Sequence, residues 1–206
     1  MIFSDEKVNE LKEQVRARLS EKRYLHTLSV AEAASRLCDM CMPEGKREAI
    51  IASLLHDVTK ELSLEEQKLL LNEGDIVLDS EDLESVSILH SFTAPILIKK
   101  LFSEFATHNV LSSVRNHTIG SPDMSVFDEI IFLADFIEDT RTYESSVKLR
   151  ELVYSNMRQN DIQNNLWVLH TACIRAIDCT VLHLIENKKK INSKNILTRN
   201  ALLSKI

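Results

Sequence analysis

The stretch Leu54-Leu55-His56-Asp57-Val58-Thr59-Lys60 places an imidazole and a carboxylate side by side at the end of an apolar run. Histidine nitrogen and carboxylate oxygen are both suitable ligands for first-row divalent metals. If the stretch is helical, Lys60 returns to the face of His56 and Asp57, because it follows them by four and three residues. A lysine beside such a pair favours a negatively charged substrate. The stretch therefore predicts part of a metal site, and other segments have to supply the remaining ligands.

The composition indicates a globular protein made mainly of helices. The 206 residues are 44% hydrophobic and 27% charged, which suffices for a sizeable core. Three glycines, three prolines and 5% aromatic residues favour helices over a sandwich or barrel. The net charge of -6 disfavours an extended nucleic-acid surface. The four cysteines include one CxxC spacing, Cys38 to Cys41, but no second such pair that would complete a zinc ribbon, and they indicate buried reduced thiols.

The N-terminal sequence and the lengths of the apolar runs predict a cytoplasmic protein. The first residues lack a basic region followed by a long apolar core, so we expect no signal peptide. No uninterrupted apolar run approaches about 18 residues, so we expect no membrane span.

The apolar spacing and the capping sequences predict one all-α domain over residues 1–206. Its core is expected to comprise residues of about 18–145, with C-terminal helices of about 146–206 packed on it. Capping-box sequences begin at Ser63 and Ser125, and Ser20 is a further expected cap. The acidic segment from 75 to 84 is expected to be a loop that passes into another helix. The expected helices span about 5–18, 20–42, 46–57, 64–73, a run after His90 to about 105, 107–117, 126–137 and, as long amphipathic helices, 146–186.

Asp135 is a second candidate ligand, because it lies in the almost wholly apolar sequence from Ile130 to Ile137. Burying an ionised carboxylate is costly unless the group is paired or bound to a metal. A cap on another helix or a pair with arginine would satisfy Asp135 as well as a metal would. Arg141, a short distance along the chain, could accordingly bind a substrate phosphate or brace Asp135.

Histidines complete the set of candidate ligands. Taken singly, a histidine on an apolar face is more often a hydrogen-bonded core residue than a ligand. Three of the seven histidines lack a potential ligand partner near them in the sequence: His108, His170 and His183. The other four form an ordered series with two aspartates: His26, His56-Asp57, His90, His117 and Asp135.

This series resembles the HD superfamily of metal-dependent phosphohydrolases, and within it the bacterial YqeK subfamily. The local sequences that carry the resemblance are Arg23-Tyr24-Leu25-His26-Thr27, Leu54–Lys60, His117-Thr118-Ile119-Gly120, Met124-Ser125 and Ala134-Asp135-Phe136-Ile137-Glu138-Asp139-Thr140-Arg141. The resemblance extends from about residue 10 to 200. It implies a single-domain HD-type helical bundle and a symmetrical bis(5'-nucleosyl)-tetraphosphatase. Such an enzyme uses metal-bound water to cleave a phosphoanhydride of diadenosine tetraphosphate, a dinucleoside polyphosphate, and releases two ADP.

The resemblance also implies roles for individual residues. The metal ligands would be His26, His56, Asp57 and Asp135. Relatives use iron, although these ligand types also suit manganese, cobalt or zinc. The catalytic residues would be Asp57, Lys60, His90 and His117. The residues expected to contact the substrate are His26, Asp57, Val58, Thr59, Lys60, His90, His117, Thr118, Asp135, Arg141, Thr180 and His183.

One departure from the family pattern concerns the third histidine. Small residues or glycine often follow it in the family, whereas Ser91 and Phe92 stand here, so Phe92 is expected to narrow the pocket. Three other functions remain open at this point. One is a phosphohydrolase for another nucleotide, such as guanosine tetraphosphate or a deoxynucleoside triphosphate. The others are a non-catalytic nucleotide sensor or ribosome-associated protein, and a purely structural bundle. A homodimer is also left open.

Overall fold

The computed structural model describes residues 3–206, which form eleven α-helices and three short 3-10 helices without any strand. The α-helices are α1 (Asp5–Arg16), α2 (Glu21–Cys41), α3 (Lys46–Leu55), α4 (Leu64–Glu73), α5 (Ser80–Glu84), α6 (Leu89–Leu101), α7 (His108–Asn116), α8 (Val126–Ile137), α9 (Glu144–Asn156), α10 (Ile162–Glu186) and α11 (Ser193–Leu203). The all-α, single-domain expectation is confirmed for the described residues.

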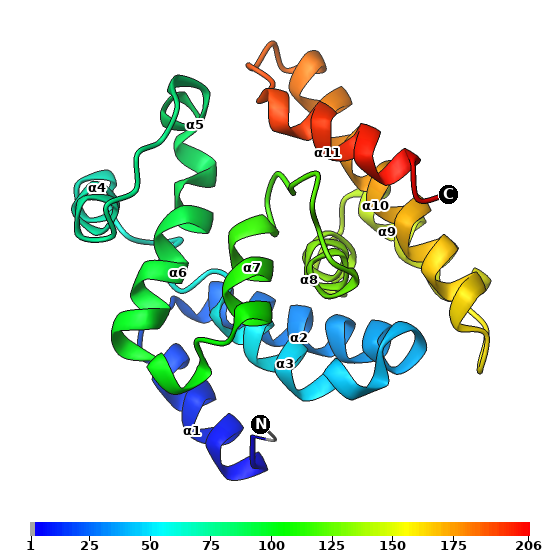
Figure 1. Ribbon diagram of the computed structural model, residues 1–206, viewed down its shortest axis with the longest axis horizontal. Coiled ribbons are helices and arrows are strands. Elements are labelled where there is room, and N and C mark those ends of the chain that lie inside the picture. Colours follow the sequence, from blue (N-terminus) through cyan, green and yellow to red (C-terminus); the bar gives the residue numbers. More distant parts are fainter. Residues whose placement is uncertain (1–2) are drawn as a thin grey trace.

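Helix α8 lies at the centre of the bundle, where Figure 1 shows it end-on between α7 and the C-terminal helices. It packs against α2, α3, α7, α9 and α10. Every side chain from Phe127 to Ala134 is buried, including the apolar Ile130, Ile131 and Leu133. Burying one such aliphatic side chain contributes about 1.5–3 kcal/mol. The apolar sequence that surrounds Asp135 is therefore the central element of the core.

Serine caps set where three of the helices begin. Ser20 accepts a hydrogen bond from the backbone of Arg23, and Ser63 and Ser125 each form a complete capping box. A cap of this kind contributes about 1 kcal/mol. The caps at Ser20 and Ser125 also determine the start of α2 and α8, which carry two of the candidate ligands.

The helix expected to continue to residue 57 ends earlier, because α3 stops at Leu55. The backbone then forms successive turns, with Val58 bonded to Leu55 and Lys60 to Asp57. The ring Nδ1 of His56 lies 2.6 Å from the carbonyl oxygen of Ser53. In a continuing helix that oxygen would accept the N–H of Asp57. The imidazole of His56 thus competes with the next helical hydrogen bond and ends the helix.

Two further boundaries differ from the expectation. His90 lies inside α6, which begins at Leu89, rather than before it. The loop of the acidic segment ends at Asp79, and residues 80–84 already form the short helix α5, which Asp79 caps by accepting the backbone N–H of Asp82. The basic C-terminal segment contains a last helix, α11, that packs on α10.

Helix α10 is long and apolar enough, by length and composition alone, to cross a membrane, with a mean hydropathy of 1.5 over its best window. The lengths of the apolar runs had predicted no such segment. In the structure α10 packs against α8, α9 and α11, and Leu169, Cys173 and Ile177 are fully buried in the main core. These contacts are those of a core helix. Cys38 and Cys41 are also buried free thiols, and burial raises the pKa of each to about 12.

The turn between α7 and α8 requires a glycine. Gly120 has a φ of 70°, in the left-handed region, and an added Cβ would lie 2.5 Å from Cγ2 of Thr198. Thr198 also donates its hydroxyl to the carbonyl of Ile119. The turn that follows His117 is therefore held closely against α11.

Replacing Gly120 with alanine is expected to lower the free energy of unfolding by about 1–3 kcal/mol, because the left-handed conformation strains any other residue. Chemical denaturation measures the change. Gly74→Ala is the matched control, since Gly74 has an ordinary φ of -90° and its added Cβ would likewise lie 2.5 Å from the end of a side chain, Cδ1 of Ile96. Equal losses in the two variants would contradict this account of Gly120.

Candidate metal centre

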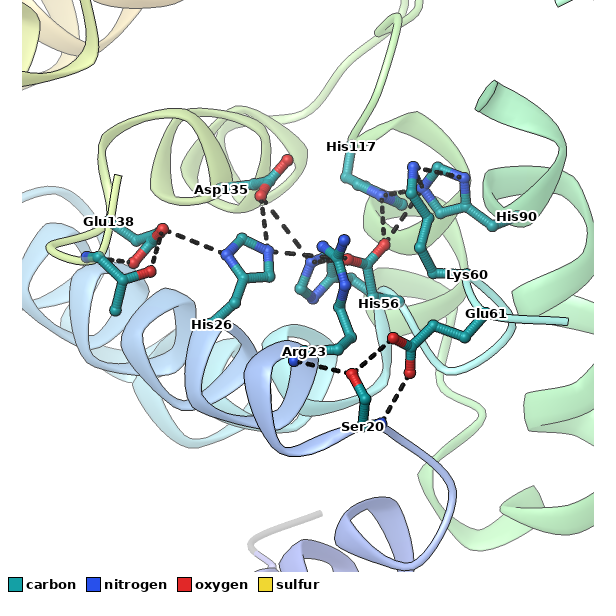
Figure 2. A network of polar contacts seen from close by, with 12 residues as sticks. Ser20, Arg23, His26, His56, Lys60, Glu61, His90, His117, Asp135 and Glu138 are labelled. Atoms are coloured by element: carbon teal, nitrogen blue, oxygen red, sulfur yellow. Dashed lines mark hydrogen bonds and ion pairs between the residues drawn. The ribbon is translucent and has the colours of Figure 1, made fainter. Parts of the chain in front are cut away.

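Polar side chains from distant parts of the chain meet beside α8 (Figure 2). Figure 2 shows Lys60, His90 and His117 together at one end of the cluster, and Asp135 and Glu138 on either side of His26 at the other. Helix α2 contributes Arg23 and His26, and the turn after α3 contributes His56, Asp57 and Lys60. His90 comes from α6, His117 directly follows α7, and Asp135 lies on α8.

Two overlapping groups of side chains have the geometry to hold a metal ion. One consists of His26, His56 and Asp135, and the other of His56, Asp57 and His117. Within each group the ligand atoms lie within 4.8 Å of one another. The buried Nε2 of His56 has no hydrogen-bond partner, so its lone pair is available. This donor set of imidazole nitrogens and carboxylate oxygens fits a first-row divalent metal.

The ring orientations follow from what each Nδ1 contacts. Nδ1 of His56 lies 2.6 Å from the carbonyl of Ser53, and Nδ1 of His117 lies 2.7 Å from the carbonyl of Val114. A carbonyl can only accept, so in both rings Nδ1 carries the proton and Nε2 keeps its lone pair. Both Nε2 atoms therefore face the cluster in the tautomer that binds metal.

His26 is oriented by a carboxylate instead. Its Nδ1 lies 3.2 Å from Oε1 of the buried Glu138, and its Nε2 lies 3.1 Å from Oδ1 of Asp135. Burial lowers the pKa of His26, but its contacts with Asp135 and Glu138 outweigh burial and raise it to about 9. Metal binding at Nε2 therefore has to displace a proton from that atom. Glu138 would retain the bond to Nδ1 and fix the ring.

Asp57 is the buried carboxylate around which the cluster is arranged. Its Oδ1 lies 3.2 Å from Nε2 of His90, and its Oδ2 lies 2.8 Å from Nη1 of Arg23. Burial raises the pKa of Asp57, but its contacts with His56 and His117 outweigh burial and hold it well below its ordinary value. Asp57 is accordingly ionised although its residue is only 3% exposed.

His90, His117 and Lys60 form a hydrogen-bonded chain at the inner end of the cluster. The two Nε2 atoms of His90 and His117 lie 3.0 Å apart, and Nζ of Lys60 lies 3.2 Å from Nδ1 of His90. Because Nε2 of His117 keeps its lone pair, Nε2 of His90 must donate, and Nδ1 of His90 accepts from Lys60. Burial lowers the pKa of both histidines, so both rings are neutral. Lys60 is therefore the only cation among these three hydrogen-bonded side chains.

Asp135 has an arginine partner as well as a histidine. Nη2 of Arg141 lies 2.7 Å from Oδ1 of Asp135, so Arg141 does brace the carboxylate, one of the two roles left open for it. Burial raises the pKa of Asp135, but Arg141 and His26 outweigh burial and hold it well below its ordinary value. Arg150 in turn binds the carbonyls of Ile137 and Arg141 at 2.5 and 2.9 Å. Arg141 and Arg150 therefore both hold the segment after α8 in place.

Sequence reasoning assigned no role to Arg23 or Glu138. Arg23 precedes His26 by three residues, and this helical spacing was the available signal that both side chains share a face. The position of Arg23 is set further by the cap at Ser20. Ser20 donates its backbone N–H and its hydroxyl to Glu61 at 2.7 and 2.6 Å, which ties the start of α2 to the turn that carries Asp57.

The side chains of Val58 and Thr59, two residues expected to contact the substrate, do not line the cluster: Val58 belongs to the main core, and Thr59 is fully buried with its hydroxyl 3.2 Å from the carbonyl of His90. Phe92 does not narrow the metal site either, because it packs in a separate apolar cluster, with the guanidinium of Arg115 3.4 Å from its ring centre.

Two cavities adjoin the cluster and contain the remaining candidates. The first, of about 290 Å³, is lined by Arg141 together with Thr180 and His183. The second, of about 370 Å³, is lined by Thr118 and again by Thr180. Most of the candidate residues thus lie at the cluster or in a cavity next to it.

Comparisons with known proteins agree with this arrangement. The HD domain model matches residues 23–139. A Bacillus subtilis protein named bis(5'-nucleosyl)-tetraphosphatase, symmetrical, is 26% identical over 190 residues, covering 92% of this chain and 94% of that protein. A protein of the same name from Halalkalibacterium halodurans is 28% identical over 193 residues, covering 92% and 93%.

A solved structure is similar over the whole length of both chains. It is described as an HD superfamily hydrolase involved in NAD metabolism from Clostridium acetobutylicum, with a TM-score of 0.82 and 29% identity. The likeness includes the helices on either side of the cluster, since all of each chain is covered. Because the HD domain model matches more than half of the sequence and the ligand series lies within that match, the chain belongs to the HD domain family.

Proposed function

We propose that this protein is a metal-dependent phosphohydrolase that cleaves diadenosine tetraphosphate symmetrically into two ADP. The observation that carries the proposal is the buried cluster itself, in which three imidazoles with inward Nε2 atoms and two ionised carboxylates share one site. Cations of Lys60, Arg23 and Arg141 surround it, as a polyphosphate requires. The names of the two bacterial relatives support this choice of substrate.

The proposed metal ligands are His26, His56, Asp57 and Asp135. When bound, a divalent metal lowers the pKa of water and polarises a phosphoryl oxygen. We propose iron, with manganese, cobalt and zinc as the alternatives that the same ligands accept. His117 shares a group with His56 and Asp57, so it would support a second metal or face the phosphates.

The side chains of the cluster have separate tasks in the proposed reaction. Water adds its oxygen to one of the two inner phosphorus atoms, and the oxygen that bridges them leaves with the second ADP. Asp57, being ionised, orients the water by accepting one of its protons in a hydrogen bond. Lys60 and the N–H of His90 stabilise the charge that builds on the phosphates, with His117 orienting His90. Arg141 holds a phosphate of one half of the substrate.

We further propose that the protein acts in the cytoplasm, and that residues of about 18–145 form the catalytic core on which the helices of 146–206 pack. Thr180 and His183 would contact a nucleotide from those C-terminal helices. A phosphohydrolase for guanosine tetraphosphate or a deoxynucleoside triphosphate, and a non-catalytic sensor, remain the alternatives. Product analysis separates them, since symmetrical cleavage yields ADP alone and a sensor yields no product.

The purified protein is expected to contain a stoichiometric divalent metal and to convert diadenosine tetraphosphate to ADP alone, as seen by metal analysis and product chromatography. Asp135→Ala should reduce turnover to background while the protein stays folded, because a ligand carboxylate is lost. Asp123→Ala, in an exposed turn, is the control with normal turnover. Formation of ATP and AMP would contradict symmetrical cleavage. An active Asp135→Ala variant would contradict the assignment of Asp135 as a metal ligand.

Glu138→Gln is expected to weaken metal binding by about 10- to 100-fold, because the ring of His26 loses the carboxylate that orients it. Competition against a chelator measures the affinity. Glu151→Gln, at an exposed position on α9, provides the matched control. Unchanged metal affinity in Glu138→Gln would show that the His26 ring needs no such support.

Arg23→Met is expected to lower kcat/KM by about 10- to 100-fold, because a charge-assisted hydrogen bond to a phosphate or to Asp57 is lost. Arg23→Lys should recover part of this loss, since it restores the charge without the planar donor group. Metal content is measured alongside the kinetics. If Arg23→Met contained less metal but kept the wild-type rate per bound metal, Arg23 would be only a structural partner of Asp57.

A further inference from the structure

We propose that the second nucleoside of the substrate binds in the cavity of about 370 Å³ that contains Thr118, so that the two nucleosides occupy separate cavities beside one metal cluster. This inference rests on the proposed function, because only a substrate with a nucleoside at both ends needs two such cavities. It adds a site for the half that Arg141 does not hold.

A symmetrical cut places requirements on both sides of the reacting bond. The bond that breaks lies at the middle of four phosphates, so two phosphates and one nucleoside extend from the cluster in each direction. The two halves are chemically identical. A protein that recognises both therefore needs two purine-sized spaces, each about two phosphates from the reacting centre.

The first space is the cavity of about 290 Å³ lined by Phe136, Arg141, Tyr143, Thr180 and His183. It joins the cluster at the end that carries Asp135, because Arg141 lies 2.7 Å from that carboxylate. Tyr143 is 71% exposed and offers an aromatic face beside the arginine. The base of one nucleoside can stack on the ring of Tyr143 while its phosphates bind the guanidinium of Arg141.

The second space is lined by neighbours of Lys60 and His117, which Figure 2 shows with His90 at the other end of the cluster. Thr118 lines this space and directly follows His117. Ser87 also lines it, and its carbonyl accepts a hydrogen bond from Nζ of Lys60 at 3.0 Å. Both cavities share Thr180, so they lie on the same side of the protein. A tetraphosphate that passes over the cluster would thus reach one cavity at each end.

The lining of the second cavity suits a nucleoside. Val86, Ile88 and Leu184 supply apolar walls for the flat face of a base. Oγ1 of Thr118 is buried and has no hydrogen-bond partner in the described chain, so a polar ligand atom would satisfy it. Lys189 adds a cation at the same cavity. Its volume falls within the range of about 300–1,000 Å³ that is usual for small-molecule sites.

Two substitutions that fill the second cavity test the proposal. Leu184→Trp acts from α10 and Val86→Trp from the segment before α6. Ile185→Trp is the matched control, since Ile185 neighbours Leu184 on α10, is 55% exposed and lines neither cavity. The metal-loaded proteins are titrated with two probes. One is diadenosine tetraphosphate with a methylene in place of the central bridging oxygen, and the other is ADP.

Both cavity-filling variants are expected to bind the methylene analogue about 10- to 100-fold more weakly, because the stacking surface for one base is lost. Their first ADP should bind with wild-type affinity, in the cavity beside Arg141, and this also reports that the variants are folded. Ile185→Trp should match the wild type with both probes.

Two results would overturn the proposal. One is binding of the analogue within about twofold of the wild type in both variants, and the other is an equal loss of affinity for ADP and for the analogue. Failure of the proposed function is seen separately, as the absence of ADP as sole product when the wild-type protein is given diadenosine tetraphosphate.

Discussion

The ionised carboxylate of Asp57, buried among imidazoles, is the interaction on which the rest of the structure depends. Removing such a charge from water costs several kcal/mol, which its partners have to offset. The partners come from α2, α6 and the residue after α7, and they include Arg23, His90 and His117. A polar cluster of this kind does not hold a fold together by itself. The apolar core around α8 supplies the stability that allows these groups to remain close, and the site uses that stability for its chemistry.

The two most buried imidazoles of the metal groups are produced by the same structural device. His56 and His117 are each the C-cap residue of a short helix, α3 and α7. In both, Nδ1 binds the carbonyl three residues earlier, which would otherwise lack a partner at the helix end. One hydrogen bond therefore satisfies the helix terminus, sets the tautomer and turns Nε2 toward the metal position. The same hydrogen bond therefore both ends the helix and orients the candidate ligand.

The cations around the cluster differ in burial, and this division matters for a polyphosphate. The side chains of Arg23 and Arg141 are 30% and 29% exposed. Lys60 is placed deeper, in contact with His90, and burial lowers its pKa. Two half-buried arginines thus lie beside the carboxylates of Asp57 and Asp135, and under the proposed function each carboxylate has a cation that it can exchange for metal while the cation binds phosphate. Arrival of the substrate can thus replace existing ion pairs instead of creating new charge in the interior.

The sequence by itself determined the helical class, the caps at Ser20, Ser63 and Ser125, and, through the motif resemblance, the series of candidate ligands from His26 to Asp135. These features are local, because periodicity and capping involve residues within about one helical turn of each other. Only the tertiary structure decided that Phe92 packs in a separate apolar cluster, that Thr59 faces the interior and that two cavities lie near the polar cluster. Arg23 illustrates the reason: its partner Asp57 lies 34 residues further along the chain, and no local pattern encodes which distant side chains meet. That outcome depends on how α2, α3, α6 and α8 pack against one another.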